Sequence, residues 1–302
     1  MSRKTPAQWL LSHHSGFNPG ENANFEFKRK DRKTKTIAIS SGKGGVGKTS
    51  VAIKMAKMLV DRGEKVLLID CDYNLSNTAV KLGIPLDSKF YDLFVNNIEF
   101  SEAVYKDGNF HLLSACNGNI DLFERSVGIE NLIVDILETH KDEYDSIILD
   151  CPAGLNKEVA VLNTYCDYRF VVITPDRSSI TDSYSLIKVL EQRHSLKSFH
   201  LIFNKISGKK QYERLTETFL KTSAHYLDCR LKVLGGIPYF NEQVDDFDRE
   251  LLKVAGSNIH KSFNKVMTRF SEEDNGNSFT DTPYFFQESL ASVKPEQEVH
   301  SI

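Results

Sequence analysis

Short apolar runs alternate with helical patterns through most of this 302-residue chain. Several runs are apolar at nearly every position, which is typical of strands covered on both faces. Between them, apolar residues recur at helical spacing, as in residues 48–62 and 180–193. This alternation predicts an α/β fold with a doubly wound, mostly parallel sheet flanked by helices. The predicted strands are residues 36–40, 65–70, 110–114, 146–150, 170–174, 199–204 and 233–238.

The composition narrows the class of protein. A net charge of −3, with 40% hydrophobic and 26% charged residues, is typical of a soluble globular protein and excludes collagen, coiled-coil rods and wholesale disorder. The near-neutral charge disfavours nucleic acid as the main partner. No apolar run reaches the ~18 residues of a membrane span. The apolar stretch at residues 7–11 is too short for a secretory signal, so we expect a cytoplasmic protein.

The chain divides into three parts by composition. Residues 1–34 are expected to form an N-terminal arm and linker, residues 35–270 the folded domain, and residues 271–302 an acidic, disordered tail. The basic run at residues 28–33 is either a solvated charge run or a contact for acidic lipid or nucleic acid. The apolar residues 284–286 in the tail either fold back on the domain or bind a partner.

A glycine-rich turn follows the first predicted strand. It matches G-x-x-x-x-G-K-[ST] and lies between a strand and a helix, as a phosphate-binding loop requires. Its glycines allow consecutive N–H groups to converge on one anion, and the next helix adds its positive N-terminus. Lys48 is expected on the β and γ phosphates, and the Thr49 hydroxyl on Mg²⁺. The predicted nucleotide-binding residues are Gly42, Lys43, Gly44, Gly45, Val46, Gly47, Lys48, Thr49 and Ser50.

A second lysine, Lys43, lies inside the same loop. The pattern K-G-G-x-G-K-[ST] resembles the deviant Walker A ATPases, the family of MinD, ParA and FlhG. The resemblance implies that Lys43 reaches the phosphates of a partner subunit and stabilises charge as the γ-phosphoryl group leaves. It also implies a homodimer in the ATP-bound state. The alternative is a solvated loop lysine.

Two aspartates end the second predicted strand. Asp70 and Asp72 are two residues apart, so their side chains point the same way. The segment resembles the family's D-x-D-x-G-L-x-N pattern, with Asn74 in place of the glycine and Asn77 at the final asparagine. By resemblance, Asp72 orients the attacking water and Asp70 supports Mg²⁺. The alternative is an aspartate pair that caps the next helix.

A third acidic position follows an apolar strand. Asp150 ends residues 146–150 and precedes Cys151, Pro152, Ala153 and Gly154. This is a Walker B pattern, and it resembles the D-S-P-A-G segment of MinD and FlhG with cysteine in place of serine. The predicted metal-binding residues are Thr49, Asp70 and Asp150, and the predicted catalytic residues are Lys43, Lys48 and Asp72.

The base of the nucleotide is expected to meet residues late in the chain. Asn204 resembles the family's adenine-reading asparagine, and Pro238 belongs to an I-P-x segment whose backbone lines the base in that family. The guanine-reading N-K-x-D pattern is not completed, because Ser207 stands at its last position. The expected cofactors are therefore ATP and Mg²⁺.

Residues 174–188 resemble the FlhG, FleN and YlxH branch, which controls flagellar number and placement. Residues 7–11 keep part of that branch's N-terminal helix, which activates a partner GTPase of the FlhF kind. Residues 259–270 are amphipathic, with lysines and Arg269 opposite the apolar face. They are either a helix that binds an anionic membrane surface on the inner face of the membrane or the last helix packed on the sheet.

These observations favour a slow, partner-stimulated ATPase that dimerises with MgATP and controls the placement or number of a cellular structure. A ParA-like ATPase that partitions DNA or another cargo is the first alternative. A metal-cluster carrier of the Mrp type is less favoured, because the five cysteines include no C-x-x-C pair. A protein that binds ATP without hydrolysing it also fits the motifs.

Overall fold

The computed structural model describes residues 34–72, 78–85, 89–96, 98–114, 129–240, 251–252 and 257–274. Several predictions concern residues outside this range. They are the N-terminal arm with its basic run, the segment 73–77 with Asn74 and Asn77, and the tail from residue 275 onward. The division of the chain at residues 34 and 270 therefore stays a prediction.

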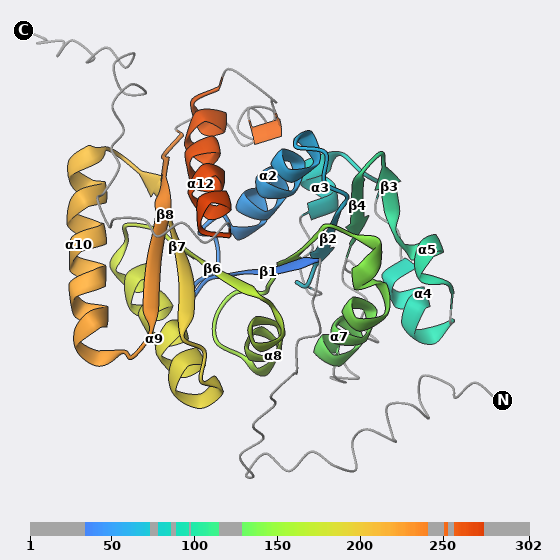
Figure 1. Cartoon of the computed structure of the whole chain (residues 1–302), viewed down its shortest axis with the longest axis horizontal. Helices are drawn as coiled ribbons and strands as arrows, with labels where there is room; N and C mark the ends of the chain where they lie inside the picture. The colour runs from blue at the N-terminus through green and yellow to red at the C-terminus, as the bar shows by residue number, and fades with distance from the viewer. Residues whose placement is uncertain are drawn as a thin grey trace, which may run out of the picture.

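Eight strands form one sheet in the order β3-β4-β2-β5-β1-β6-β7-β8 (Figure 1). All neighbouring strands are parallel except β3, which runs antiparallel to β4. The predicted doubly wound, mostly parallel sheet is confirmed. The strands are β1 (Lys35–Ser40), β2 (Val66–Asp70), β3 (Tyr105–Asp107), β4 (Phe110–Leu113), β5 (Ser146–Asp150), β6 (Tyr168–Ile173), β7 (Ser198–Ile206) and β8 (Arg230–Pro238).

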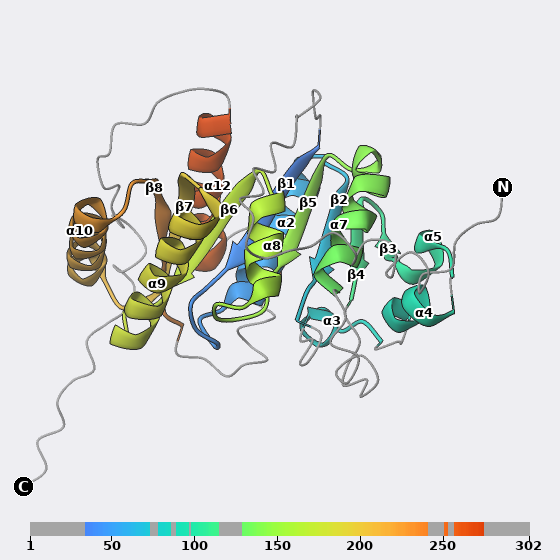
Figure 2. The same ribbon diagram turned by 90° about the horizontal axis from the view of Figure 1, so that it is seen from below.

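Helices cover both faces of the sheet (Figures 1 and 2). One face packs against α2 (Lys48–Asp61) and α12 (Asn258–Asp274). The helices that bury apolar residues against the other face include α7 (Ile129–His140), α8 (Lys157–Tyr165), α9 (Arg177–His194) and α10 (Lys209–Tyr226). The shorter elements are α3 (Thr78–Leu82), α4 (Lys89–Val95), α5 (Phe100–Ala103) and the 3₁₀ helix η1 (Lys141–Glu143).

The central strands are buried on both faces. Every residue of β2 and β5 is buried, as is every residue of β1 after Lys35. Each fully buried aliphatic side chain of this kind contributes roughly 1.5–3 kcal/mol to the free energy of unfolding. Because β1 lies beside β5 and β5 beside β2, the carboxyl ends of these three strands meet at one edge of the sheet. This edge is where ligands bind in open α/β sheets.

The sequence prediction missed one strand. β3 contains only three residues, all exposed, and pairs at the edge of the sheet with β4. An exposed edge strand buries no apolar face, so no apolar run marks it in the sequence. Strands β7 and β8 also begin earlier than predicted, at Ser198 and Arg230, because backbone pairing between them continues past their apolar residues.

Helix α12 decides between the two predictions made for residues 259–270. Its apolar side chains are 2% exposed or less, because they pack against β8, β6 and α2. The guanidinium of Arg269 donates hydrogen bonds to the backbone carbonyls of Val233 and Leu234 at 3.1 and 3.4 Å. The prediction that residues 259–270 form a helix packed on the sheet is confirmed, and the apolar face proposed for a membrane is already buried. The buried residues are Ile259, Phe263, Val266, Met267 and Phe270.

Helix α12 also extends to Asp274, four residues beyond the predicted domain boundary at 270. The Ser271 hydroxyl donates to the carbonyl of Met267 at 2.9 Å, which accommodates a polar residue within the helix. None of the helices in the described ranges is long and apolar enough to cross a membrane.

Candidate nucleotide-binding site

The predicted phosphate-binding loop joins β1 to α2 at the carboxyl edge of the sheet (Figure 1). Helix α2 begins at Lys48, and the N–H of Val51 donates to the carbonyl of Gly47 at 3.0 Å. Val46 is buried in the apolar layer under α2, whereas Lys43, Gly44 and Gly45 are exposed. The middle of the loop, at residues 43–45, is therefore exposed, whereas Val46 is anchored in the core.

Close contacts explain two of the loop glycines. A Cβ atom at Gly42 would lie 2.1 Å from the backbone carbon of Asp182 and 2.4 Å from the backbone nitrogen of Ser183, both on α9. A Cβ atom at Gly47 would lie 2.5 Å from Nδ2 of Asn204, and Gly47 has a φ of 96°. A larger residue at Gly42 would push the loop away from the α9 backbone, whereas at Gly47 it would displace the Asn204 side chain of β7 and adopt a φ that favours glycine. The loop is thus tightly packed between these two elements.

The predicted metal ligands come together at the ends of β2 and β5. Asp70 and Asp150 are register partners on these strands, and both are buried. Thr49, in the first turn of α2, forms a hydrogen bond with the Asp150 carboxylate. Burial and the neighbouring Asp70 raise the pKa of Asp150 well above its ordinary value, although Thr49 and Lys48 act in the opposite direction. Burial and the neighbouring carboxylate thus disfavour the ionised form of Asp150.

These residues fit a magnesium ion. Oδ1 of Asp150 is buried and has no hydrogen-bond partner among the described residues. The donors in reach are carboxylate and hydroxyl oxygens, the ligands that Mg²⁺ prefers. The described ranges hold no group of three or more His, Cys, Asp or Glu side chains that could hold a metal ion by themselves. A Mg²⁺ ion that binds one or two carboxylates and completes its shell with phosphate oxygens and water matches this arrangement.

Two residues of the predicted acidic segments, Asp72 and Gly154, lie beside the same site. The N–H of Asp72 donates to Oδ1 of Asp70 at 3.0 Å, and the Asp72 side chain is half-buried. The N–H of Gly154 donates to the carbonyl of Ser41 at 3.0 Å. The segment after β5 is therefore hydrogen-bonded to Ser41, the residue that precedes the phosphate-binding loop. A displacement of this segment would break that hydrogen bond or move Ser41 with it.

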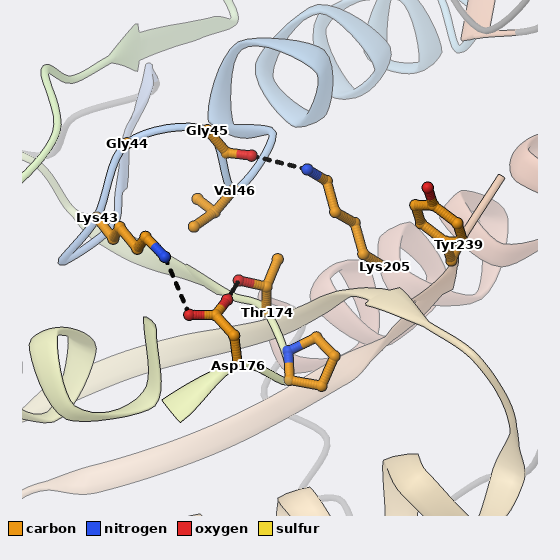
Figure 3. Close-up of a pocket in the computed structure, with 9 residues that line it drawn as sticks. Lys43, Gly44, Gly45, Val46, Thr174, Asp176, Lys205 and Tyr239 are labelled. Atoms are coloured by element: carbon orange, nitrogen blue, oxygen red, sulfur yellow. Dashed lines mark hydrogen bonds and ion pairs between the residues drawn. The ribbon is translucent and has the colours of Figure 1, made fainter. Parts of the chain in front are cut away.

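The Lys43 side chain points toward Asp176, at the N-terminal end of α9 (Figure 3). Its ammonium contacts Oδ1 of Asp176 at 3.1 Å and Oγ of Ser178 at 2.7 Å. Hydrogen bonds from the Thr174 hydroxyl and the Ser179 N–H, with those from Ser178 and Lys43, hold the pKa of Asp176 well below its usual range. Asp176 also caps α9, so Lys43 is bound to a carboxylate whose position the helix fixes.

Asn204 and Lys205 hold the loop from the end of β7. Nδ2 of Asn204 donates to the carbonyl of Val46 at 2.7 Å, and Nζ of Lys205 donates to the carbonyl of Gly45 at 2.8 Å (Figure 3). Oδ1 of Asn204 accepts from the N–H of Lys205 at 2.9 Å. The Asn204 amide is thus bound to the protein itself, and its predicted contact with adenine stays a prediction.

Pro238 ends β8 as the register partner of Ile206, close to these two residues. The next residue, Tyr239, lines a cavity of about 350 Å³ together with loop residues, Asp176 and Lys205. Sequence reasoning assigned no role to Asp176, Ser178, Lys205 or Tyr239. The Asn-Lys pair at the end of a strand was the signal available for Lys205, whereas the other three contacts depend on how distant segments pack.

Comparison with known proteins identifies the family. A model described as an AAA domain (AAA_31) matches residues 34–201. The antiactivator FleN of Pseudomonas aeruginosa is 28% identical over 204 residues, which are 67% of this chain and 73% of that protein. The flagellum site-determining protein YlxH of Helicobacter pylori is 30% identical over 211 residues, which are 68% of this chain and 69% of that protein.

The fold has close structural neighbours. The septum site-determining protein MinD of Pyrococcus horikoshii, solved in complex with Mg-ADP, superposes with a TM-score of 0.66 at 21% identity. The match covers 82% of this chain and all of that one. Together with the loop between β1 and α2 and the acidic pair beside it, these matches confirm the predicted family. The chain belongs to the AAA domain family, among the P-loop ATPases of the MinD and FleN type.

Proposed function

We propose that this protein is an ATP-driven switch that forms a face-to-face homodimer with MgATP and hydrolyses the nucleotide slowly until a partner stimulates it. The switch would control the number or placement of a cellular structure, and the similarity to FleN and YlxH favours flagella. The free cysteines of the described residues support a reducing, cytoplasmic location. A GTPase partner remains a prediction from residues 7–11, outside the described residues.

The observation that carries the proposal is the contrast between the two lysines of one loop. Lys48 is 9% exposed and lies beside the acidic pair of its own site. The Lys43 side chain is 44% exposed and is paired with Asp176 instead (Figure 3). A cation that served only its own phosphates would be expected beside Lys48. Lys43 is instead accessible to a second molecule that approaches the same face.

Apolar residues at the same edge support a dimer face. Val80 on α3, Leu155 after β5 and Tyr239 after β8 are 60%, 46% and 55% exposed. Each follows the carboxyl end of a strand, so all three lie on the side of the sheet that carries the loop. Exposed apolar residues along the edge that carries the charged site favour an interaction surface there.

The residues divide the chemistry in the following way. Lys48 and the loop N–H groups bind the phosphates, and Thr49, Asp70 and Asp150 hold the metal and its water shell. Bound Mg²⁺ neutralises phosphate charge and orients the γ-phosphate. Asp72 orients the attacking water, and Lys43 completes the site of the partner subunit. Slow turnover follows if Asp72 reaches its working position only in the dimer.

Two substitutions test the proposal. Asp72→Ala should retain ATP binding, lose turnover and accumulate dimer, because the ATP that holds the dimer together is no longer hydrolysed. Lys43→Ala should retain nucleotide binding but fail to dimerise. Lys221→Ala is the matched control, since it removes an exposed lysine and its ion pair with Glu217 on α10, away from the loop. The molar mass of the protein in solution, measured with ATP and with ADP, reports dimer formation. The rate of phosphate release reports ATP hydrolysis.

Two results would contradict the proposal. If Asp72→Ala hydrolyses ATP at the wild-type rate, the role assigned to Asp72 is wrong. If the wild-type protein remains a monomer with MgATP at all concentrations, the switch mechanism is wrong. Strong DNA binding that weakens steeply between two salt concentrations would instead favour the ParA-like alternative.

A further inference from the structure

We propose that Asn163 is a positioning residue for the phosphate-binding loop, and that it acts through the Ser40 hydroxyl to hold the loop in register with the end of β5. The inference rests on the proposed function, because it concerns how the two halves of the same site are kept together. It assigns a role to a side chain that lies on α8 and is not part of any of the predicted motifs.

Asn163 is a polar side chain in an apolar layer. It is fully buried on α8, and Ser40 is fully buried at the end of β1. Successive residues of a strand face opposite sides of the sheet. Ile39 packs in the apolar layer under α2, so Ser40 faces the layer on the other side, where α8 lies (Figure 1). There Nδ2 of Asn163 donates a hydrogen bond to Oγ of Ser40 at 2.7 Å.

Ser40 connects this amide to both halves of the site. It is the last residue of β1, and the phosphate-binding loop follows it. Its hydroxyl also forms a hydrogen bond with the thiol of Cys151, the residue directly after the predicted metal ligand Asp150. The N–H of Cys151 donates to the carbonyl of Ile39 at 3.0 Å. A side chain of α8 is thus bonded to the strand that leads into the loop and, through Ser40, to the residue beside the metal site.

The stability of the fold does not explain an asparagine at this position. Oδ1 of Asn163 is buried and has no hydrogen-bond partner among the described residues. The other contact of Nδ2 is with the carbonyl of Val159 at 2.8 Å, one turn earlier in the same helix. A buried polar atom without a partner destabilises the folded state, whereas an apolar side chain of similar shape would not. The hydrogen bond to Ser40 is the contact that gives the amide a purpose.

The register matters because the phosphates and the metal are held from different elements. The loop would bind the phosphates, whereas Asp150 would hold Mg²⁺ from the end of β5. Phosphate oxygens and a carboxylate can share one Mg²⁺ only if the two elements lie at the right separation, since the ion demands near-ideal octahedral geometry. We therefore expect Asn163 to affect the Mg²⁺-dependent part of nucleotide binding and to leave the metal-free part nearly unchanged.

Calorimetric titration of the full chain with ATP, once with Mg²⁺ and once with excess chelator, separates these two parts. The ratio of the two dissociation constants measures the contribution of Mg²⁺. Asn163→Leu keeps the branched shape but not the amide. It should reduce this ratio about fivefold, and change the metal-free ATP affinity by less than about twofold.

Two further variants connect the effect to Ser40. Ser40→Ala should reduce the ratio to a similar extent, and the double variant should be no worse than Ser40→Ala alone, because both changes break the same hydrogen bond. Thr164→Val is the matched control. It removes a hydroxyl that donates to the Ala160 carbonyl at 2.8 Å within α8, and it should leave the ratio unchanged.

Stability distinguishes positioning from a structural role. Asn163→Leu should unfold at the same urea concentration as the wild type or a higher one, since it removes a buried acceptor without a partner. A less stable Asn163→Leu protein with the wild-type ratio would make Asn163 a structural residue and overturn the proposal. A wild-type ratio in Ser40→Ala would also overturn it, and this variant serves even if leucine does not fit at position 163. If the wild-type chain binds no ATP under either condition, the proposed function itself fails, and that result is seen before any variant is made.

Discussion

Lys43 and Asp176 form an ion pair within one chain, with Nζ and Oδ1 3.1 Å apart. Both side chains are nearly half exposed, and such a pair contributes at most about 1 kcal/mol. The contact is strong enough to give Lys43 a defined resting position and weak enough to be broken when a partner's phosphates approach. When Lys43 moves away, the Asp176 carboxylate keeps its hydrogen bonds from Thr174, Ser178 and Ser179.

Asp176→Asn tests whether this ion pair opposes dimerisation. Asparagine keeps the helix cap of α9 but removes the charge that holds Lys43. If Lys43 must leave Asp176 to reach a partner, the variant should dimerise more readily with MgATP, with a dissociation constant lower by up to about fivefold. Sedimentation at a series of protein concentrations measures this. A weaker dimer would mean that Asp176 supports the interface instead.

Gly42→Ala should destabilise the fold by more than about 2 kcal/mol, because the new methyl group meets the α9 backbone, which cannot give way cheaply. Gly44→Ala is the matched control, since the nearest atom to its Cβ is that of Ala153 at 3.9 Å. Urea denaturation without nucleotide compares the two variants. Equal stabilities would show that the loop can move away from α9 at little cost.

Asp150→Asn should reveal the cost of the buried carboxylate pair. Without metal, removing one of two neighbouring buried carboxylates should leave the free energy of unfolding unchanged or raise it by about 1 kcal/mol. With MgATP, the wild type should gain stability and the variant should gain much less. Thermal denaturation with excess chelator gives the stability without metal, and thermal denaturation with MgATP gives the gain on binding. Asp228→Asn, at an exposed carboxylate, is the control. A full MgATP-dependent gain in Asp150→Asn would remove Asp150 from the metal site.

His200 should make stability depend on pH. It is buried among Tyr168, Phe170 and Phe270, and burial lowers its pKa from 6.5 to about 4. Between pH 6.5 and 4 the unfolded chain therefore binds more protons than the folded one at this residue. Its contribution is fully present above pH 6.5 and declines as the pH falls toward 4, by about 3 kcal/mol in all. Denaturation curves between pH 7.5 and 5 should show a shallower decline in His200→Phe; identical slopes would exclude His200 as the cause.

Phe263→Ala tests the assignment of α12 to the core. Phe263 is 2% exposed, so its truncation should lower the free energy of unfolding by roughly 3 kcal/mol or more. Lys261→Glu, on the exposed face of the same helix, should leave stability nearly unchanged. Denaturation in urea and co-sedimentation with anionic vesicles are measured on both variants. A stable Phe263→Ala protein that loses vesicle binding would restore the membrane-helix prediction.

The sequence predicted all of the sheet except one edge strand, because apolar runs mark strands that are covered on both faces. It did not predict β3, whose three residues are exposed. In the site, it predicted that Thr49, Asp70 and Asp150 would meet, since parallel strands bring their carboxyl ends to one edge. For Asn204 it predicted a contact with the base, which stays a prediction, and it did not predict the hydrogen bond from the Asn204 amide nitrogen to the Val46 carbonyl.

The sequence by itself determined the phosphate-binding loop and the layered α/β fold, because glycine spacing and hydrophobic periodicity are local properties of a chain. The tertiary structure alone decided what Lys43, Lys205 and α12 contact. Lys43 and Asp176 are 133 positions apart, and Lys205 and Gly45 are 160 positions apart. Contacts over such separations depend on how helices and strand ends pack against each other, and no local pattern in the sequence encodes that packing.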